Sequence, residues 1–205
     1  IDPARENQRE TQILLTRSPV MTRLQSFFRS LILAIGLTGL GLSFGHAGDG
    51  PVLLTVTGAV STPNRGGYDA ATDKFFGYSG VEFDQARAFT WADLQGLKNV
   101  TVSADFPKGE TVHSFTGPLL ADVLAAAGAT GATVTIQALD GYAVEAPFAE
   151  MIADGAVVAT SLDGVDLGIG DFGPTMIVFP RAERDDLKDM PDDRWVWSIF
   201  HINVK

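Results

Sequence analysis

The chain has 205 residues, 45% of them hydrophobic, with a formal net charge of −10 and no cysteine. This length and composition suffice for one domain with a sizeable core, which must be stable without disulfides. The acidic balance argues against nucleic acid and anionic membranes as partners, because both would repel the protein. It favours cationic ligands or basic patches on proteins instead.

Residues 21–47 are typical of a secretory signal peptide. Arg23 and Arg29 precede an apolar run over 31–44, and small residues lead up to a cleavage position after Ala47. The run is too short and too rich in glycine to favour a membrane-spanning helix, and an uncleaved anchor is the alternative. We therefore predict a periplasmic protein without stable membrane insertion after cleavage.

Residues 1–20 are polar, lack a starting methionine and precede a good start at Met21, so we interpret them as an upstream extension outside the fold. The predicted domain is 48–205. The first 47 residues hold five basic and three acidic residues, so cleavage would change the formal charge from −10 to −12.

The sequence of the first half of the domain predicts two strands and one short helix. Residues 53–60 and 99–106 are rich in β-branched residues, as strands are. Thr90 is placed to cap a helix over 91–97. Residues 65–80 form a Gly/aromatic segment, whose aromatic side chains we interpret as covering an edge of the core; a functional lid is the alternative.

A helix with one apolar stripe is predicted next. Pro118 suits its first turn, where the missing N–H has no partner to lose, and Gly128 follows as a left-handed stop. The apolar residues of the stripe are Leu119, Leu120, Val123, Leu124 and Ala127.

The second half of the domain is mostly strands. Residues 133–138 alternate between two faces, Asp140-Gly141 forms a tight turn, and 143–148 continues as a strand. A short helix over 148–153 and three further strands follow, at 156–161, 175–179 and 195–204. Phe200, Ile202 and Val204 alternate with His201 and Asn203 in the closing strand. The pattern predicts an α+β, mostly β domain with mixed strand pairing.

Two motifs are excluded by their context. Residues 168–173 match G-x-G-x-x-G, but Pro174 and a β-branched run follow where a dinucleotide site needs a helix. The segment 181–194 carries many aspartates at spacings that fit no calcium loop. Its arginines and lysine are interleaved with them, so we interpret it as a solvated turn.

The histidines do not predict a catalytic or metal site. Only His113 and His201 follow the signal peptide, and no Gly-x-Ser-x-Gly elbow is present. A zinc site needs three or four ligands, and no spacing in the chain provides them. Asp140 and Tyr142, in contrast, place polar tips on a turn at the mouth of the strand layer, where a ligand could bind.

The order of short motifs resembles the oxidoreductase molybdopterin-binding domain, the fold of the sulfite oxidase catalytic domain. The motifs are Phe-Thr-Gly-x-x-Leu-x-x-x-Leu from Phe115, Asp-Gly-Tyr from Asp140, Gly-Pro-x-x-Ile-Val-Phe-Pro from Gly173, and Trp-Val from Trp195. The resemblance covers about 52–205 and implies the mixed-sheet fold of that family.

Three departures set this chain apart from the family. The family's molybdenum is held by a cysteine thiolate, but the matching window, about 102–106, reads Val-Ser-Ala-Asp-Phe. Met176 stands where the family has an arginine, and Arg194 where it has a lysine before the tryptophan. The chain is thus short of basic groups for the phosphate of a pterin.

Two hypotheses follow. The first is an exported binding or accessory module on a degenerate molybdopterin-binding fold, with no cofactor or metal. It would bind a small molecule or a periplasmic protein partner at five candidate residues: Ser103, Asp105, His113, Asp140 and Tyr142. The alternative is an oxidoreductase that holds molybdopterin without a thiolate ligand.

Overall fold

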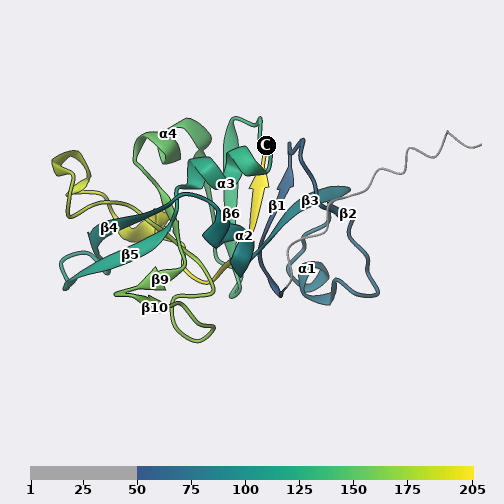
Figure 1. Cartoon of the computed structure of the whole chain (residues 1–205). Helices are drawn as coiled ribbons and strands as arrows, with labels where there is room; N and C mark the ends of the chain where they lie inside the picture. The colour runs from purple at the N-terminus through teal and green to yellow at the C-terminus, as the bar shows by residue number, and fades with distance from the viewer. Residues whose placement is uncertain (1–49) are drawn as a thin grey trace, which may run out of the picture. The chain divides into compact units, whose positions relative to one another are not determined.

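The computed structural model describes residues 50–205 (Figure 1). The predicted upstream extension, 1–20, and signal peptide, 21–47, lie outside these residues. Strands dominate the described part, its four α-helices are short, and its largest sheet mixes parallel and antiparallel pairs. This architecture confirms the predicted α+β, mostly β class. Within it, no helix has the length and apolar character needed to cross a membrane.

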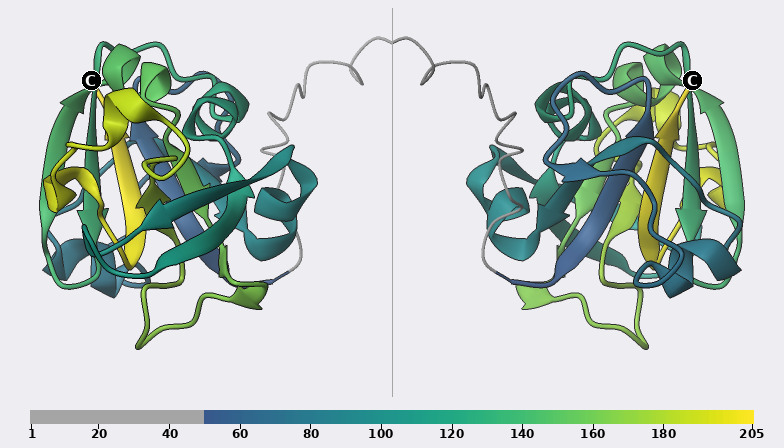
Figure 2. Two further views of the ribbon diagram at one scale, coloured as in Figure 1. Left: turned by 90° about the vertical axis from the view of Figure 1, so that its left-hand side faces the viewer. Right: turned by 90° about the vertical axis from the view of Figure 1, so that its right-hand side faces the viewer.

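The largest sheet has the strand order β2-β3-β1-β12-β6-β7 (Figure 2). Its strands are β1 (Val52–Gly58), β2 (Arg65–Gly66), β3 (Gln85–Thr90), β6 (Thr133–Ala138), β7 (Ala143–Pro147) and β12 (Ile199–Val204). β1 and β12 pair in parallel, and the other neighbours pair antiparallel. Because side chains alternate across a sheet, Val134, Ile136 and Ala138 of β6 are buried, as predicted.

The predicted alternation in the closing strand is wrong at Phe200. The pairing of β12 with β6 shifts between Ile199 and His201, which leaves Phe200 as the extra residue of a bulge. Ile199 and Ile202 therefore point into the main core, while Phe200 and His201 both contact Phe76. Residues 195–198, which the sequence assigned to the strand, precede it as irregular structure.

A second sheet has the order β10-β9-β5-β4, and a two-stranded ribbon joins β11 to β8. The strands are β4 (Asn99–Asp105), β5 (Val112–Pro118), β8 (Val157–Ala159), β9 (Ser161–Leu162), β10 (Val165–Asp166) and β11 (Met176–Val178). The loop 168–173 passes through Pro174 directly into β11. No helix begins there, in agreement with the rejection of a dinucleotide site.

The helices are all short. They are α1 (Lys74–Tyr78), α2 (Trp91–Gly96), α3 (Leu120–Ala126), α4 (Phe148–Ala153) and the 3-10 turns η1 (Asp185–Leu187) and η2 (Asp192–Arg194). Thr90 caps α2 as predicted. Its Oγ1 accepts the Asp93 N–H at 3.2 Å, while Asp93 Oδ2 accepts the Thr90 N–H at 2.8 Å, which completes a capping box.

The helix with the apolar stripe, predicted to begin at Pro118, begins two residues later. Pro118 is the last residue of β5, opposite Asn99, and the helix begins at Leu120. Leu119 is extended and bridges to Val157, so the chain stays in the strand layer one residue beyond the proline. Gly128 does take the predicted left-handed conformation, with φ of 62°.

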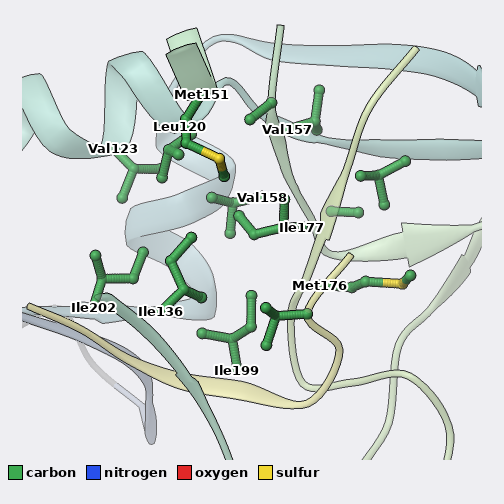
Figure 3. Close-up of a cluster of buried hydrophobic side chains, with 14 of the residues drawn as sticks. Leu120, Val123, Ile136, Met151, Val157, Val158, Met176, Ile177, Ile199 and Ile202 are labelled. Carbon is green, nitrogen blue, oxygen red and sulfur yellow. The ribbon is translucent and has the colours of Figure 1, made fainter. Parts of the chain in front are cut away.

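The main core lies between the large sheet, α3, α4 and the ribbon of β8 and β11 (Figure 3). Ile136, Ile199 and Ile202 enter it from the sheet, and Leu120 and Val123 from α3. Its remaining labelled members are Met151, Val157, Val158, Met176 and Ile177. Each buried aliphatic side chain of this size contributes about 1.5–3 kcal/mol, so this cluster is the main source of stability.

The aromatic segment 65–80 covers the opposite face of the large sheet (Figure 1). Phe76 packs edge-on against Phe83, with 5.4 Å between the ring centroids, and it packs with its ring tilted by 51° against Phe200, 5.6 Å away. The guanidinium of Arg65 lies over both Phe76 and Phe83. The predicted covering role therefore holds for Phe76, but it is wrong for Tyr78, which is 88% exposed.

Gly117 lets β5 approach β8 closely. A Cβ at this position would lie 2.8 Å from Ala159 Cα and would clash with the carbonyl oxygen of Val158. Backbone atoms cannot move aside as a flexible side chain can, so Gly117→Ala should lower the free energy of unfolding by about 2 kcal/mol or more. Gly96→Ala is the matched control, because a Cβ there meets nothing within 4 Å and alanine favours the helix. Denaturant unfolding in which both variants match the native protein would contradict this packing.

Candidate functional site

A pocket of about 340 Å³ opens beside the turn between β6 and β7. We call it the aromatic pocket; its lining residues are Phe106, Ala138, Asp140, Tyr142, Asp192, Trp195 and Trp197. They come from three separate segments: the end of β4, the β6–β7 turn, and the stretch from η2 to β12. The volume is that of an ordinary small-molecule site.

The β6–β7 turn holds Asp140 and Tyr142 in fixed positions. Asp140 Oδ1 accepts the Tyr142 N–H at 2.9 Å, and Gly141 takes φ of 91°, a conformation that favours glycine. The Tyr142 hydroxyl donates to the Asp193 carbonyl at 2.8 Å, although 48% of the residue is exposed. Both predicted residues therefore line one pocket, and the ring of Tyr142 is fixed at both ends.

Arg181 lies buried next to the pocket, with 1% of its side chain exposed. Its Nε donates to Asp105 Oδ1 at 2.7 Å, and its Nη1 donates to Asp192 Oδ1 at 2.6 Å and to the Met190 carbonyl at 2.9 Å. Nη2 donates to the Asp105 carbonyl. The guanidinium also lies over the ring of Trp195, 4.4 Å from its centroid. This buried cation ties the end of β4 to the segment before β12.

Asp105 is held ionised by the same contacts. Burial opposes its ionisation, but hydrogen bonds from Gly109 N–H and Arg181, with the charge of Arg181, outweigh burial and keep its pKa below the ordinary value. Both carboxylate oxygens are thus engaged, one by Gly109 and one by Arg181. Asp105 positions neighbouring residues and offers no free oxygen to a ligand.

His113 lies at a second pocket, of about 320 Å³, on the other side of Phe106. Its Nδ1 is 2.7 Å from Asp163 Oδ2, and Asp163 Oδ1 accepts the Ser114 N–H at 2.9 Å. These two hydrogen bonds, the one from Ser114 first, hold the pKa of Asp163 below its usual range. Among the described residues no hydroxyl bonds to His113, so the pair lacks a nucleophile.

Ser103 lines none of these pockets. Its N–H donates to Glu183 Oε1 at 2.5 Å, its carbonyl accepts the Ala182 N–H, and it stands opposite Ser114 in the second sheet. Of the five predicted residues, the structure thus brings Asp140 and Tyr142 together and places Asp105 beside them. His113 is at the neighbouring pocket, and Ser103 has a backbone role.

The sequence reasoning missed Phe106, Trp195, Trp197 and the role of Arg181. Phe106 stacks on Trp195 at 5.4 Å with 10° between the ring planes. The interpretation of 181–194 as a solvated turn is wrong for Arg181, which is buried. No short-range pattern showed that Asp105 and Phe106 meet Arg181 and Trp195, because the two pairs lie far apart in the chain.

The residues present do not fit a molybdopterin. No basic side chain lines the aromatic pocket, and the nitrogens of Arg181 are committed to protein acceptors. Arg194 pairs with Asp154 at 2.9 Å, and Met176 is buried in the core. The described residues also contain no cluster of three or more histidine and acidic side chains able to hold a metal ion. A phosphate-bearing cofactor would meet two aspartates where it needs cations.

Comparison with known proteins supports the fold alone. No protein-family model matches the chain, and no curated protein matches it. Among solved structures, it is similar to the sulfane dehydrogenase SoxCD from Paracoccus pantotrophus, with a TM-score of 0.52 and 16% sequence identity. The likeness covers 75% of this chain and 38% of that one. It supports the coarse part of the sequence resemblance, a distant molybdopterin-oxidoreductase-like fold.

Proposed function

We propose that the domain is an exported binding or accessory module on a degenerate molybdopterin-oxidoreductase fold, which binds a small ligand at the aromatic pocket. One observation carries the proposal. Asp105 lies in the window that the resemblance matches to the family's cysteine ligand. Both of its carboxylate oxygens accept hydrogen bonds, one from Arg181 and one from Gly109, and the aromatic pocket lies beside it. These contacts support the proposal, because they leave Asp105 without a free oxygen for a metal beside a pocket that can hold a small ligand.

The wall of the pocket supports binding rather than redox chemistry. Tyr142 and Trp197 are large, about half exposed aromatic side chains, and exposed aromatic rings in a concave site are a common feature of recognition surfaces. The strongly acidic chain keeps nucleic acid and anionic membranes out of the set of partners we propose. A periplasmic protein that inserts a side chain into the pocket would be an equivalent partner.

Metal analysis tests the loss of cofactor chemistry. Protein produced in a host that makes molybdopterin should contain no stoichiometric molybdenum and show no sulfite or sulfoxide turnover, because no thiolate and no free cation stand at the site. A molybdenum enzyme produced in the same host is the control, and its molybdenum content shows that the host supplies the cofactor. Stoichiometric molybdenum in the native protein would restore the oxidoreductase alternative, with Ser103 and Asp105 as the first residues to test.

Export is the second part of the proposal. We expect protein recovered from the periplasm to begin after Ala47, since the segment 21–47 has the features of a cleaved signal. Intact-mass measurement decides this. A periplasmic or membrane-bound species that still carries Met21 to Ala47 would contradict it, and a variant with Ala47→Arg is the control that should block cleavage.

A further inference from the structure

We infer that the aromatic pocket takes an organic cation, such as a quaternary ammonium compound. The inference rests on the proposed function and narrows its ligand class. Two features of the pocket carry it: a carboxylate without an ion-pair partner and aromatic side chains with free surface.

The negative charge of the pocket comes from Asp140. Asp192 also lines it, but Asp192 Oδ1 accepts from Arg181 and Oδ2 accepts the Lys108 N–H at 2.9 Å, so that carboxylate is already compensated. Asp140 accepts only the Tyr142 N–H, and no basic side chain of the described residues lies within ion-pair distance of it. A cation entering the pocket would therefore gain a carboxylate partner without displacing one.

The aromatic walls suit a cation that is weakly hydrated. Tyr142 is 48% exposed and Trp197 is 42% exposed, so both rings keep surface available to a ligand. The hydroxyl of Tyr142 is fixed on Asp193, and Trp197 packs edge-on against Phe172 at 6.4 Å between centroids. The negative faces of these fixed rings attract an alkylammonium group. A carboxylate without aromatic neighbours would instead bind a small metal ion better than an alkylammonium ion.

Trp195 contributes little free surface to the pocket. It is 2% exposed, far less than Tyr142 and Trp197, and the guanidinium of Arg181 lies over its ring, 4.4 Å from the centroid. The rings available to a cation are therefore those of Tyr142 and Trp197.

Choline is the probe that tests the inference on the whole domain. Because Trp195 and Trp197 line the pocket, binding should change the intrinsic fluorescence saturably, and calorimetry should give the same affinity. The neutral carbon isostere, in which a tert-butyl group replaces the trimethylammonium group, should bind at least about ten-fold more weakly, the range expected for loss of a cation–π and a charge contact. Tetramethylammonium, which keeps the charge but lacks the hydroxyethyl group, should also bind more tightly than the neutral isostere.

Variants assign the binding to the pocket. Asp140→Asn keeps an oxygen that can accept the Tyr142 N–H, so the turn should persist, and choline affinity should fall about ten-fold. Trp197→Leu should weaken binding to a similar extent. Asp122→Asn makes the same charge change on α3, outside the pocket lining, and should leave affinity unchanged. Equal melting temperatures of the three variants exclude unfolding as the cause.

The outcomes separate this inference from the proposed function. Binding of the neutral isostere as tightly as choline, or unchanged choline affinity in Asp140→Asn, overturns the cation assignment and leaves a binding module. No binding of any ammonium probe also overturns it. Stoichiometric molybdenum in the native protein defeats the proposed function itself.

Discussion

Arg181→Ala should cost about 3 kcal/mol of folding free energy, because it strands Asp105 and Asp192 partly buried and without their cation. The change also removes the packing of the guanidinium on Trp195. Denaturant unfolding measures the loss. Arg181→Lys keeps the charge but cannot reach both carboxylates and the Met190 carbonyl at once, so it should recover part of the stability.

Arg184→Ala is the matched control for that measurement. Arg184 pairs with Asp186 at 2.5 Å, but both side chains are substantially exposed, and exposed ion pairs add little to stability. Equal losses in Arg181→Ala and Arg184→Ala would show that the Arg181 network does not tie β4 to the segment before β12.

Acidification should destabilise the domain by about 3 kcal/mol through His201 alone. Burial lowers the pKa of His201 from 6.5 to about 4, while in the unfolded chain it stays near 6.5. Between these values the unfolded state binds the extra proton and the folded state does not, so stability falls as the pH drops from 6.5 towards 4. Below about 4 both states are protonated and this contribution no longer changes.

His201→Gln isolates this term from the carboxylates, which titrate at lower pH. His201 Nε2 lies 2.7 Å from Thr57 Oγ1, and the glutamine amide can occupy that position without taking up a proton. Free energies of unfolding measured at several pH values between 7 and 4 should fall more steeply for the native protein than for the variant. Parallel curves would contradict the assigned role of His201.

Local signals in the sequence were sufficient for much of the fold. The alternation in 133–138 gave β6 with its bounds, and Thr90 gave the start of α2, because each signal lies within the element it specifies. The strand β5 escaped prediction since its polar residues His113, Ser114 and Thr116 hid the alternation. Pro118 suits both a strand end and a first helical turn, and only the bridge from Leu119 to Val157 decides between them.

The candidate site could be predicted only in part, because a sequence shows only those contacts that form between residues close together in the chain. Asp140 and Tyr142 share one turn, and an Asp-Gly turn is visible in a few residues. Arg181 and Asp105 are 76 positions apart, and Phe106 meets Trp195 across a similar distance in the chain. No short-range pattern reports such pairs. The sequence therefore identified one wall of the pocket and missed the other walls.

The parallel pairing of β1 with β12 bears on the order in which the protein is made. β12 lies between β1 and β6, so the large sheet stays divided until residues 199–204 have left the ribosome. β1 can pair with β3 early on one edge, but its other edge must wait for β12, about 145 residues downstream. Closing so long a loop is slow, because chain entropy is lost before the contacts form.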